Sequence, residues 1–302
     1  MNAFLWLKAQ TQRTYIALIL RITCFLIFGG RAFEHLFWNV PYREFFWSQK
    51  LMGDFVGSVL GMSWNQYMTS GVVDFNIQLL IKGIGVIFAI AAFCSLIYTQ
   101  KNKVFAIGIL LGVVFMLPLL WLHFFGDPYN TPLFFEFTAQ FCSPLFLLYL
   151  IRYPQKNIPV VGVKIAIALT FIAHGLYAMN VFPLPQKFIR MMIVGFGTSN
   201  ILAKDILFYL GMADLIVAVG IFFPKAIKWC AFYAFVWGFF TAFARLYTYV
   251  VPYDFWRSFS QSITGFLVRT PHYSLPLIIF LIVITLEKTA KRAAALKLKE
   301  GA

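Results

Sequence analysis

The sequence predicts an all-α polytopic membrane protein, a bundle of eight transmembrane helices arranged as two parallel four-helix repeats. Three observations support this fold class. Apolar residues make up 61% of the 302 residues, and charged residues only 12%, about half the charged share of an ordinary soluble domain. The apolar residues are gathered in windows of about 18 or more, the length that crosses the hydrocarbon of a bilayer. The last four of these segments also resemble a loose copy of the first four.

Each predicted span is a long apolar run bounded by polar or charged residues. The eight runs cover residues 15–38, 75–98, 104–123, 133–151, 160–182, 206–223, 229–250 and 263–286. Arg269, Pro271 and Pro276 interrupt the last one. Proline is tolerated in a membrane helix where neighbours satisfy the freed carbonyl, so we expect a kink there and not a break.

Matching landmarks divide the chain into residues 1–155 and 156–302, each expected to form one four-helix repeat. Pro128-Tyr129-Asn130 corresponds to Pro252-Tyr253-Asp254 after the third span of each half, and Pro144 corresponds to Pro276 in the fourth. Because each half holds an even number of spans, the halves share one orientation and are related by an axis along the membrane normal.

The distribution of basic residues predicts that both termini are cytoplasmic, in a plasma (bacterial inner) membrane. Segments assigned to the inner side hold thirteen Lys and Arg residues against the acids Glu287 and Glu300, whereas the outer loops hold seven bases against six acids. This bias is typical of membrane topology. The net charge of +14 is therefore attributed to topology and to a basic tail near anionic lipid, and no nucleic-acid partner is expected.

The two longest outer loops carry short amphipathic segments. Residues 42–59 and 187–196 mix aromatic and aliphatic residues with charges at helical spacing. We expect short helices that lie in the membrane interface near the outer mouth of the bundle.

Ionisable residues inside the spans lie mainly in the predicted outer half. A charge in the bilayer interior costs at least about 2.5 kcal/mol, so each one is a candidate functional residue. The set consists of Arg31, Glu34, His35, Lys82, His123, Glu136, His174, Asp214 and Arg245. This asymmetry predicts a polar cavity open to the outside above an apolar inner half. Ion channels and proton pumps are disfavoured, because they need polar groups across the whole membrane.

Within this set, His174, Glu34 and His35 are the candidate catalytic residues, since an imidazole beside a carboxylate suits proton transfer near neutral pH. Arg31, Glu34 and His35 are spaced i, i+3 and i+4, so we expect them on one helix face. The candidate ligand-binding residues are Arg31, His123, Glu136 and Arg245.

Lys82 and Asp214 occupy equivalent positions in the two repeats and carry opposite charges. Pairing lowers the cost of burying each charge. We therefore expect a structural ion pair at the centre of the bundle.

No metal site is predicted. His35, His123, His174 and His272 all lie toward the outer side, but none forms an i, i+4 pair and no HExxH or CxxCH motif occurs. The four cysteines have no CxxC spacing, which favours packing roles.

His174-Gly175 within residues 165–180, followed by Asp214 within residues 210–220, resembles the DoxX-like superfamily of tandem four-helix membrane proteins. The first half is similar at Phe28-Gly29-Gly30-Arg31, with Lys82 in place of the acid. The resemblance implies a membrane subunit associated with quinone or thiol redox chemistry, like thiosulfate:quinone oxidoreductase subunits and methylamine-utilisation proteins.

The leading hypothesis is thus a membrane subunit whose outward-facing polar cavity takes a quinone and whose electrons come from a membrane or periplasmic protein partner. No flavin, nicotinamide or iron–sulfur motif is found, and a quinone is the cofactor considered. One alternative is a non-enzymatic scaffold or accessory subunit that docks a partner complex. Another is a lipid or small-molecule transporter, which the apolar inner half disfavours.

Overall fold

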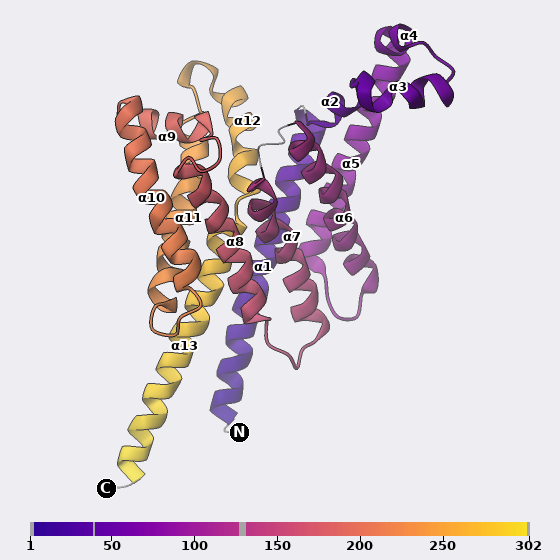
Figure 1. Ribbon diagram of the computed structural model, residues 1–302. Helices are drawn as coiled ribbons and strands as arrows, with labels where there is room; N and C mark the ends of the chain where they lie inside the picture. Colours follow the sequence, from indigo (N-terminus) through magenta and orange to yellow (C-terminus); the bar gives the residue numbers. More distant parts are fainter. Residues whose placement is uncertain (1–2, 39, 127–130, 301–302) are drawn as a thin grey trace.

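The computed structural model describes residues 3–38, 40–126 and 131–300, and its regular secondary structure over these ranges is entirely helical (Figure 1). Long helices lie side by side, and the first helix, α1 (Ala3–Phe37), and the last, α13 (Pro271–Glu300), place both chain ends at the same end of the bundle. The landmark Pro128-Tyr129-Asn130 lies outside the described residues.

Across the described ranges, seven segments are long and apolar enough to cross a membrane. They lie in α1, α5 (Gly71–Ile97), α6 (Lys103–Gly126), α7 (Leu133–Arg152), α8 (Val160–Ala178), α11 (Ile227–Tyr247) and the C-terminal stretch that includes α13. The helix expected over residues 206–223 is present as α10 (Asn200–Gly220) but is not among them. It ends three residues earlier than expected, and its length includes Lys204, Asp205 and Asp214.

The last predicted span also differs from the structure. Residues 263–267 belong to a separate helix, α12 (Phe255–Leu267), and α13 begins only at Pro271. Proline at the first helical position is favourable because its missing N–H would have no partner there anyway. The expectation of a kink without a break is therefore wrong between Leu267 and Pro271, where one helix ends and the next begins, whereas α13 continues through Pro276.

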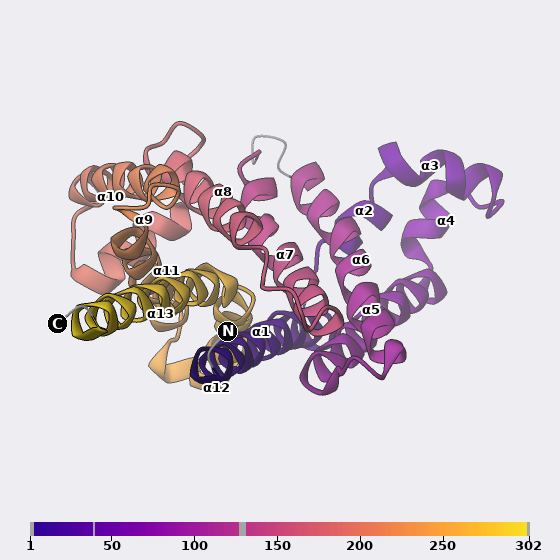
Figure 2. The same ribbon diagram turned by 90° about the horizontal axis from the view of Figure 1, so that it is seen from below.

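The two halves have the same helix neighbours. In the first half, α1 packs on α5, α5 on α6, α6 on α7 and α7 on α1; in the second, α8 packs on α10, α10 on α11, α11 on α13 and α13 on α8. Helices α7 and α8, together with α1 and α13, join the halves (Figure 2). Identical neighbour order is what a tandem repeat requires, and the equivalence of the halves remains a prediction.

The short helices gather at the end of the bundle opposite the termini, called here the distal end (Figure 1). They are α2 (Tyr42–Phe46), α3 (Gln49–Ser58), α4 (Trp64–Thr69), α9 (Gln186–Phe196), the 3₁₀ turn Pro252–Asp254 and α12. The helices expected over residues 42–59 and 187–196 are confirmed. Helices α3 and α4 project beyond the bundle around a small core of Met52, Val56 and Tyr67.

Two arginines of α1 bind the exposed ends of neighbouring helices near the termini. The last carbonyl groups of a helix have no partner within the helix. Arg21 donates to the carbonyl of Ser95 at 3.2 Å, near the end of α5, and Arg13 donates to that of Tyr153 at 3.1 Å, just after α7. Each guanidinium group therefore lies among backbone carbonyl groups and not among apolar side chains.

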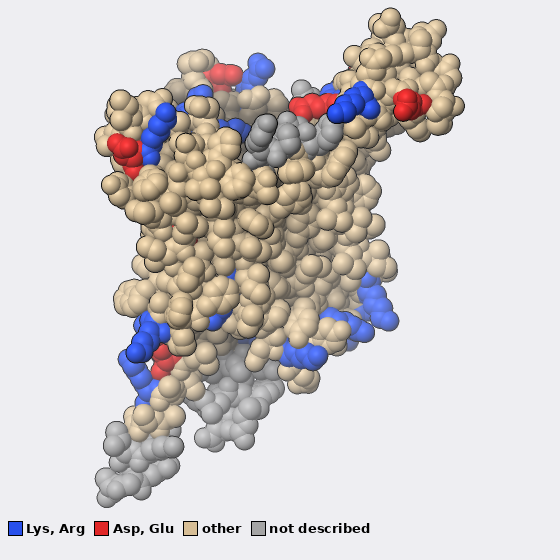
Figure 3. Space-filling model, in the orientation of Figure 1, with Lys and Arg blue, Asp and Glu red and all other residues tan. Residues whose placement is uncertain are grey.

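Charged side chains on the visible face lie at the two ends of the bundle, and a broad band without them lies between (Figure 3). Charges avoid the hydrocarbon of a bilayer because of their desolvation cost. The band is thus the part of this surface suited to contact lipid.

Candidate functional site

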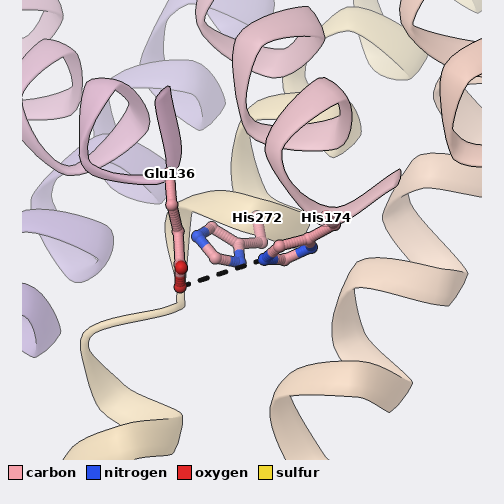
Figure 4. Close-up of side chains that lie close together, drawn as sticks. All are labelled: Glu136, His174 and His272. Carbon is pink, nitrogen blue, oxygen red and sulfur yellow. Dashed lines mark ion pairs between the residues drawn. The ribbon is translucent and has the colours of Figure 1, made fainter. Parts of the chain in front are cut away.

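Three side chains from different helices meet toward the distal end: Glu136 of α7, His174 of α8 and His272 of α13 (Figure 4). The Nε2 atom of His174 is 3.9 Å from Oε1 of Glu136, and the two imidazole ring centres are 5.0 Å apart. All three residues are at most 8% exposed. We call these residues the Glu-His-His cluster; it combines a carboxylate with two imidazoles in a nearly water-free setting.

Small residues bring the surrounding helices close to this cluster. A Cβ atom on Gly175, next to His174, would lie 2.8 Å from the carbonyl oxygen of Gly211 in α10, and one on Gly238 of α11 would overlap the backbone of His272. Glycine permits such approach because it has no side chain. The positions of His174 and His272 therefore depend on close helix packing.

Cationic side chains surround the cluster on its distal side. Nη2 of Arg269, in the α12–α13 connection, lies 2.8 Å from Oε1 of Glu136. Arg245 of α11 packs its guanidinium 5.5 Å from the ring centre of Phe188 in α9, and the same ring lies 6.2 Å from that of His174. Arg245 thus shares the Phe188 ring with His174, and Arg269 pairs with the carboxylate of the cluster.

Lys187, the neighbour of Phe188 on α9, is exposed and stands at the rim of this group. The surrounding protein, followed by the positive charges of Arg269 and Arg245, lowers the pKa of Lys187 below its usual value. Glu136 and Glu34 act in the opposite direction on this side chain.

A second polar group, on α1, adjoins the first. Arg31 donates to Glu34 and to Gln140 of α7, both at 2.9 Å, and its guanidinium lies 5.1 Å from the ring centre of Phe137. His123 of α6 is 6.1 Å from the same ring. Because Gln140 is one helical turn from Glu136, α7 carries both groups on one stretch.

His35 packs against other helices than Arg31 does, and its membership of a site with Arg31 and Glu34 remains a prediction. Its imidazole is fully buried between Tyr42 and Phe88, with ring-centre distances of 5.5 and 5.0 Å. Its Nδ1 atom is 2.6 Å from the carbonyl oxygen of Arg31. Helix α1 contacts both α5 and α7, and Arg31 reaches Gln140 of α7 while His35 packs against Phe88 of α5.

The predicted ion pair between Lys82 and Asp214 does not form. Lys82 is exposed on α5, whereas Asp214 is buried on α10 and accepts a hydrogen bond from Trp237. The two helices lie on opposite sides of the bundle (Figures 1 and 2). Lys82 follows Asp74 and Gln78 at i+4 spacing, a polar stripe that leads to the distal end.

Sequence reasoning missed Arg269, His272, Lys187 and Gln140 as members of the site. Arg269 and His272 flank the start of α13, which the sequence interpretation had merged into one span. The available signal was a basic residue and a histidine on either side of Thr270-Pro271 inside an otherwise apolar stretch.

Several polar atoms of the site lack a hydrogen-bond partner among the described residues. They are Nε2 of His174, both ring nitrogens of His272 and the Nε atoms of Arg245 and Arg269. Buried polar groups in native proteins are nearly always bonded, so each open atom is a candidate contact for a ligand or for water.

The donor set of the Glu-His-His cluster matches that of transition-metal sites, and its ligand atoms lie within 4.8 Å of one another. The surrounding charge opposes such an ion. The Glu136 carboxylate already pairs with Arg269, and Arg245 is close enough to interact electrostatically with both. A divalent cation would add repulsion to a region already rich in positive charge.

Comparison with protein-family models, curated proteins and solved structures gives no significant match for this chain. The class of the protein is therefore inferred from its own helices. Seven apolar helical segments of membrane-spanning length, counted over the described residues, define a polytopic helical membrane protein that contacts the lipid bilayer.

Proposed function

We propose that this protein is a membrane subunit that binds a quinone-type ring at the Glu-His-His cluster and handles protons during its reduction. The single observation that supports the proposal is this cluster itself: Glu136, His174 and His272 meet at one end of an apolar helix bundle, and their imidazoles have open nitrogen atoms. The resemblance to DoxX-like proteins supports the same chemical class.

The side chains of the cluster could bind the quinone ring and also supply a proton to it. Reduction of a quinone to a quinol consumes two electrons and two protons. An imidazole N–H of His174 or His272 would bond a ring oxygen, and His174 beside Glu136 at 3.9 Å would deliver a proton. The chain has no cofactor motif, so the electrons would come from a redox protein partner at the membrane surface.

The rings around the cluster suit an aromatic ligand. Phe188 contacts both His174 and Arg245, and Phe137 contacts Arg31. Apolar walls with a few oriented polar groups are typical of small-molecule sites. In the proposed topology the distal end faces outward from a plasma (bacterial inner) membrane and both termini are cytoplasmic.

Quinone content tests the proposal. Protein purified from membranes in a mild detergent is expected to retain quinone, and His174→Ala is expected to lower the retained amount at least tenfold. Exposed Tyr209 on α10 provides the control variant Tyr209→Phe, which should retain quinone like the wild type. Absence of quinone from well-folded wild-type protein reconstituted with excess quinone would refute the proposal.

A non-enzymatic scaffold is the second candidate, and the hydrogen-bonded polar group of α1 favours it. Arg31, Glu34 and Gln140 bond to one another across α1 and α7, as expected of a network that fixes helix packing. A scaffold would bring down the same protein partner from detergent extracts after His174→Ala as before. Loss of partner activity in that variant would exclude this reading.

A further inference from the structure

More cations than acids surround the Glu-His-His cluster. Four cations face this region from four parts of the chain: Arg31 of α1, Lys187 of α9, Arg245 of α11 and Arg269 before α13. Among the described residues, the acids beside them are Glu34 and Glu136. Both are already in ion pairs, with Arg31 at 2.9 Å and with Arg269 at 2.8 Å. Among the described residues, Arg245 and Lys187 have no ion pair of their own.

Both remaining cations share the charge of Glu136 at longer range, and neither forms an ion pair with another described group. Arg245 has its Phe188 contact but no ion pair in the part of the chain that the structure describes, and its Nε atom is buried without a hydrogen-bond partner. The Nε atom of Arg269 is also open, although that residue pairs through Nη2. A buried cation without a partner carries a large desolvation cost. An anion is the group that would remove it.

The chemistry of the donors narrows the class of anion. Guanidinium groups present several N–H donors in a plane and match the paired oxygens of carboxylate, phosphate and sulfate groups. The open Nε atoms of Arg245 and Arg269 are buried, the side chain of Arg269 is 18% exposed and Lys187 is exposed, so the cations extend from the interior to solvent. The buried imidazoles of His174 and His272 lie beneath them.

We propose that Arg245 and Arg269, with Lys187 at the rim, form an oxyanion-binding site next to the Glu-His-His cluster. The site would take a carboxylate, phosphate or sulfate type of group, carried either by a soluble ion or by a lipid headgroup. The inference adds a ligand class to the site of the proposed function and rests on that function only in using the same end of the bundle.

Binding of inorganic sulfate and phosphate to the full chain in neutral detergent tests the inference, by titration calorimetry at constant ionic strength with chloride as reference. Arg245→Gln is expected to weaken binding at least tenfold, because a charge-assisted hydrogen bond and a full charge are lost. Arg257, exposed on α12 at the same end, supplies the control variant Arg257→Gln, which should bind like the wild type.

Two milder variants keep the test decisive if Arg245→Gln fails to fold. Arg245→Lys retains the charge but loses the forked donors, and Lys187→Gln changes an exposed side chain; each is expected to weaken binding several-fold. Equal binding by the wild type and all these variants, or no binding by the wild type, would overturn the inference.

A second experiment, with lipids, identifies the source of the anion. In nanodiscs that contain phosphatidylglycerol and phosphatidylcholine, native mass spectrometry reports which lipid the protein retains. Selective retention of phosphatidylglycerol that Arg245→Gln abolishes supports a lipid headgroup, and binding of inorganic anion without that selectivity supports a soluble ion. If neither occurs, the inference fails. Quinone content measured on the same samples separates this outcome from failure of the proposed function.

Discussion

Arg269 places its Nη2 atom 2.8 Å from Oε1 of Glu136, and this ion pair joins the last helix pair of the second half to the last helix of the first. The carboxylate is 8% exposed and the guanidinium 18%. The contact therefore connects the two halves where water screens it poorly.

Glu136→Gln is expected to lower the free energy of unfolding by about 3–5 kcal/mol, because removing one partner of a buried pair leaves the other charge uncompensated. Unfolding in mixed detergent micelles with increasing dodecyl sulfate measures the change. The matched control is Glu287→Gln, which breaks the more exposed Lys228–Glu287 pair of 2.7 Å and should cost only about 0–1 kcal/mol. Similar losses of unfolding free energy in both variants would contradict the prediction that the Glu136–Arg269 pair stabilises the protein more than the Lys228–Glu287 pair does.

His35 and His174 are expected to respond differently to substitution. His35 is enclosed by Tyr42 and Phe88 and bonded to the backbone of Arg31, so His35→Ala should destabilise the protein by about 2–4 kcal/mol through a cavity and a lost hydrogen bond. Quinone retained per folded molecule should stay the same. His174→Ala should instead lower the retained quinone and change the stability less. A loss of quinone caused by His35→Ala in fully folded protein would assign His35 to the site.

Gly175 and Gly83 provide a matched pair for helix packing. A Cβ on Gly175 would lie 2.8 Å from the carbonyl oxygen of Gly211, whereas one on Gly83 of α5 would meet nothing within 4 Å. Gly175→Ala is expected to force α8 and α10 apart and to cost about 1–3 kcal/mol. Gly83→Ala should be neutral or stabilising by up to about 1 kcal/mol, since alanine favours helix. Unfolding measurements check both, and a harmless Gly175→Ala would show that the two helices separate at no cost.

Tyr42 in α2 predicts a pH dependence at the alkaline end. Burial raises the pKa of Tyr42 to about 12 from an ordinary value of 10. The folded protein therefore holds the phenol proton where the unfolded chain has lost it, and stability should fall as the pH rises from 10 toward 12, by up to about 2–3 kcal/mol. Below pH 10 this residue should have no effect.

Thermal unfolding of the wild type and Tyr42→Phe between pH 9 and 11.5 measures this effect. The Tyr42 hydroxyl has no hydrogen-bond partner among the described residues, so the variant should match the wild type at neutral pH and lose less stability above pH 10. Tyr209→Phe, at an exposed position, should follow the wild type throughout. Parallel pH profiles for the wild type and Tyr42→Phe would contradict the prediction.

The sequence by itself determined the class of protein, because that class depends on local composition. A helix that crosses hydrocarbon must be apolar along its whole length, so α1, α5, α6, α7, α8 and α11 were visible as runs of residues. The short helices at the distal end were equally visible from their amphipathic spacing. The boundaries of α10 and of the α12–α13 connection were less clear, because charges and prolines interrupt their apolar patterns.

Only the tertiary structure decided which polar residues meet. Spacing along a helix does not say which neighbouring helix each residue contacts. Arg31 and His35 are one turn apart, yet Arg31 contacts α7 and His35 contacts α5. Lys82 and Asp214 lie on helices at opposite sides of the bundle, which keeps the two opposite charges apart. Arg269 reaches Glu136 from 133 residues away because helix packing, and not sequence distance, fixes the geometry at the distal end.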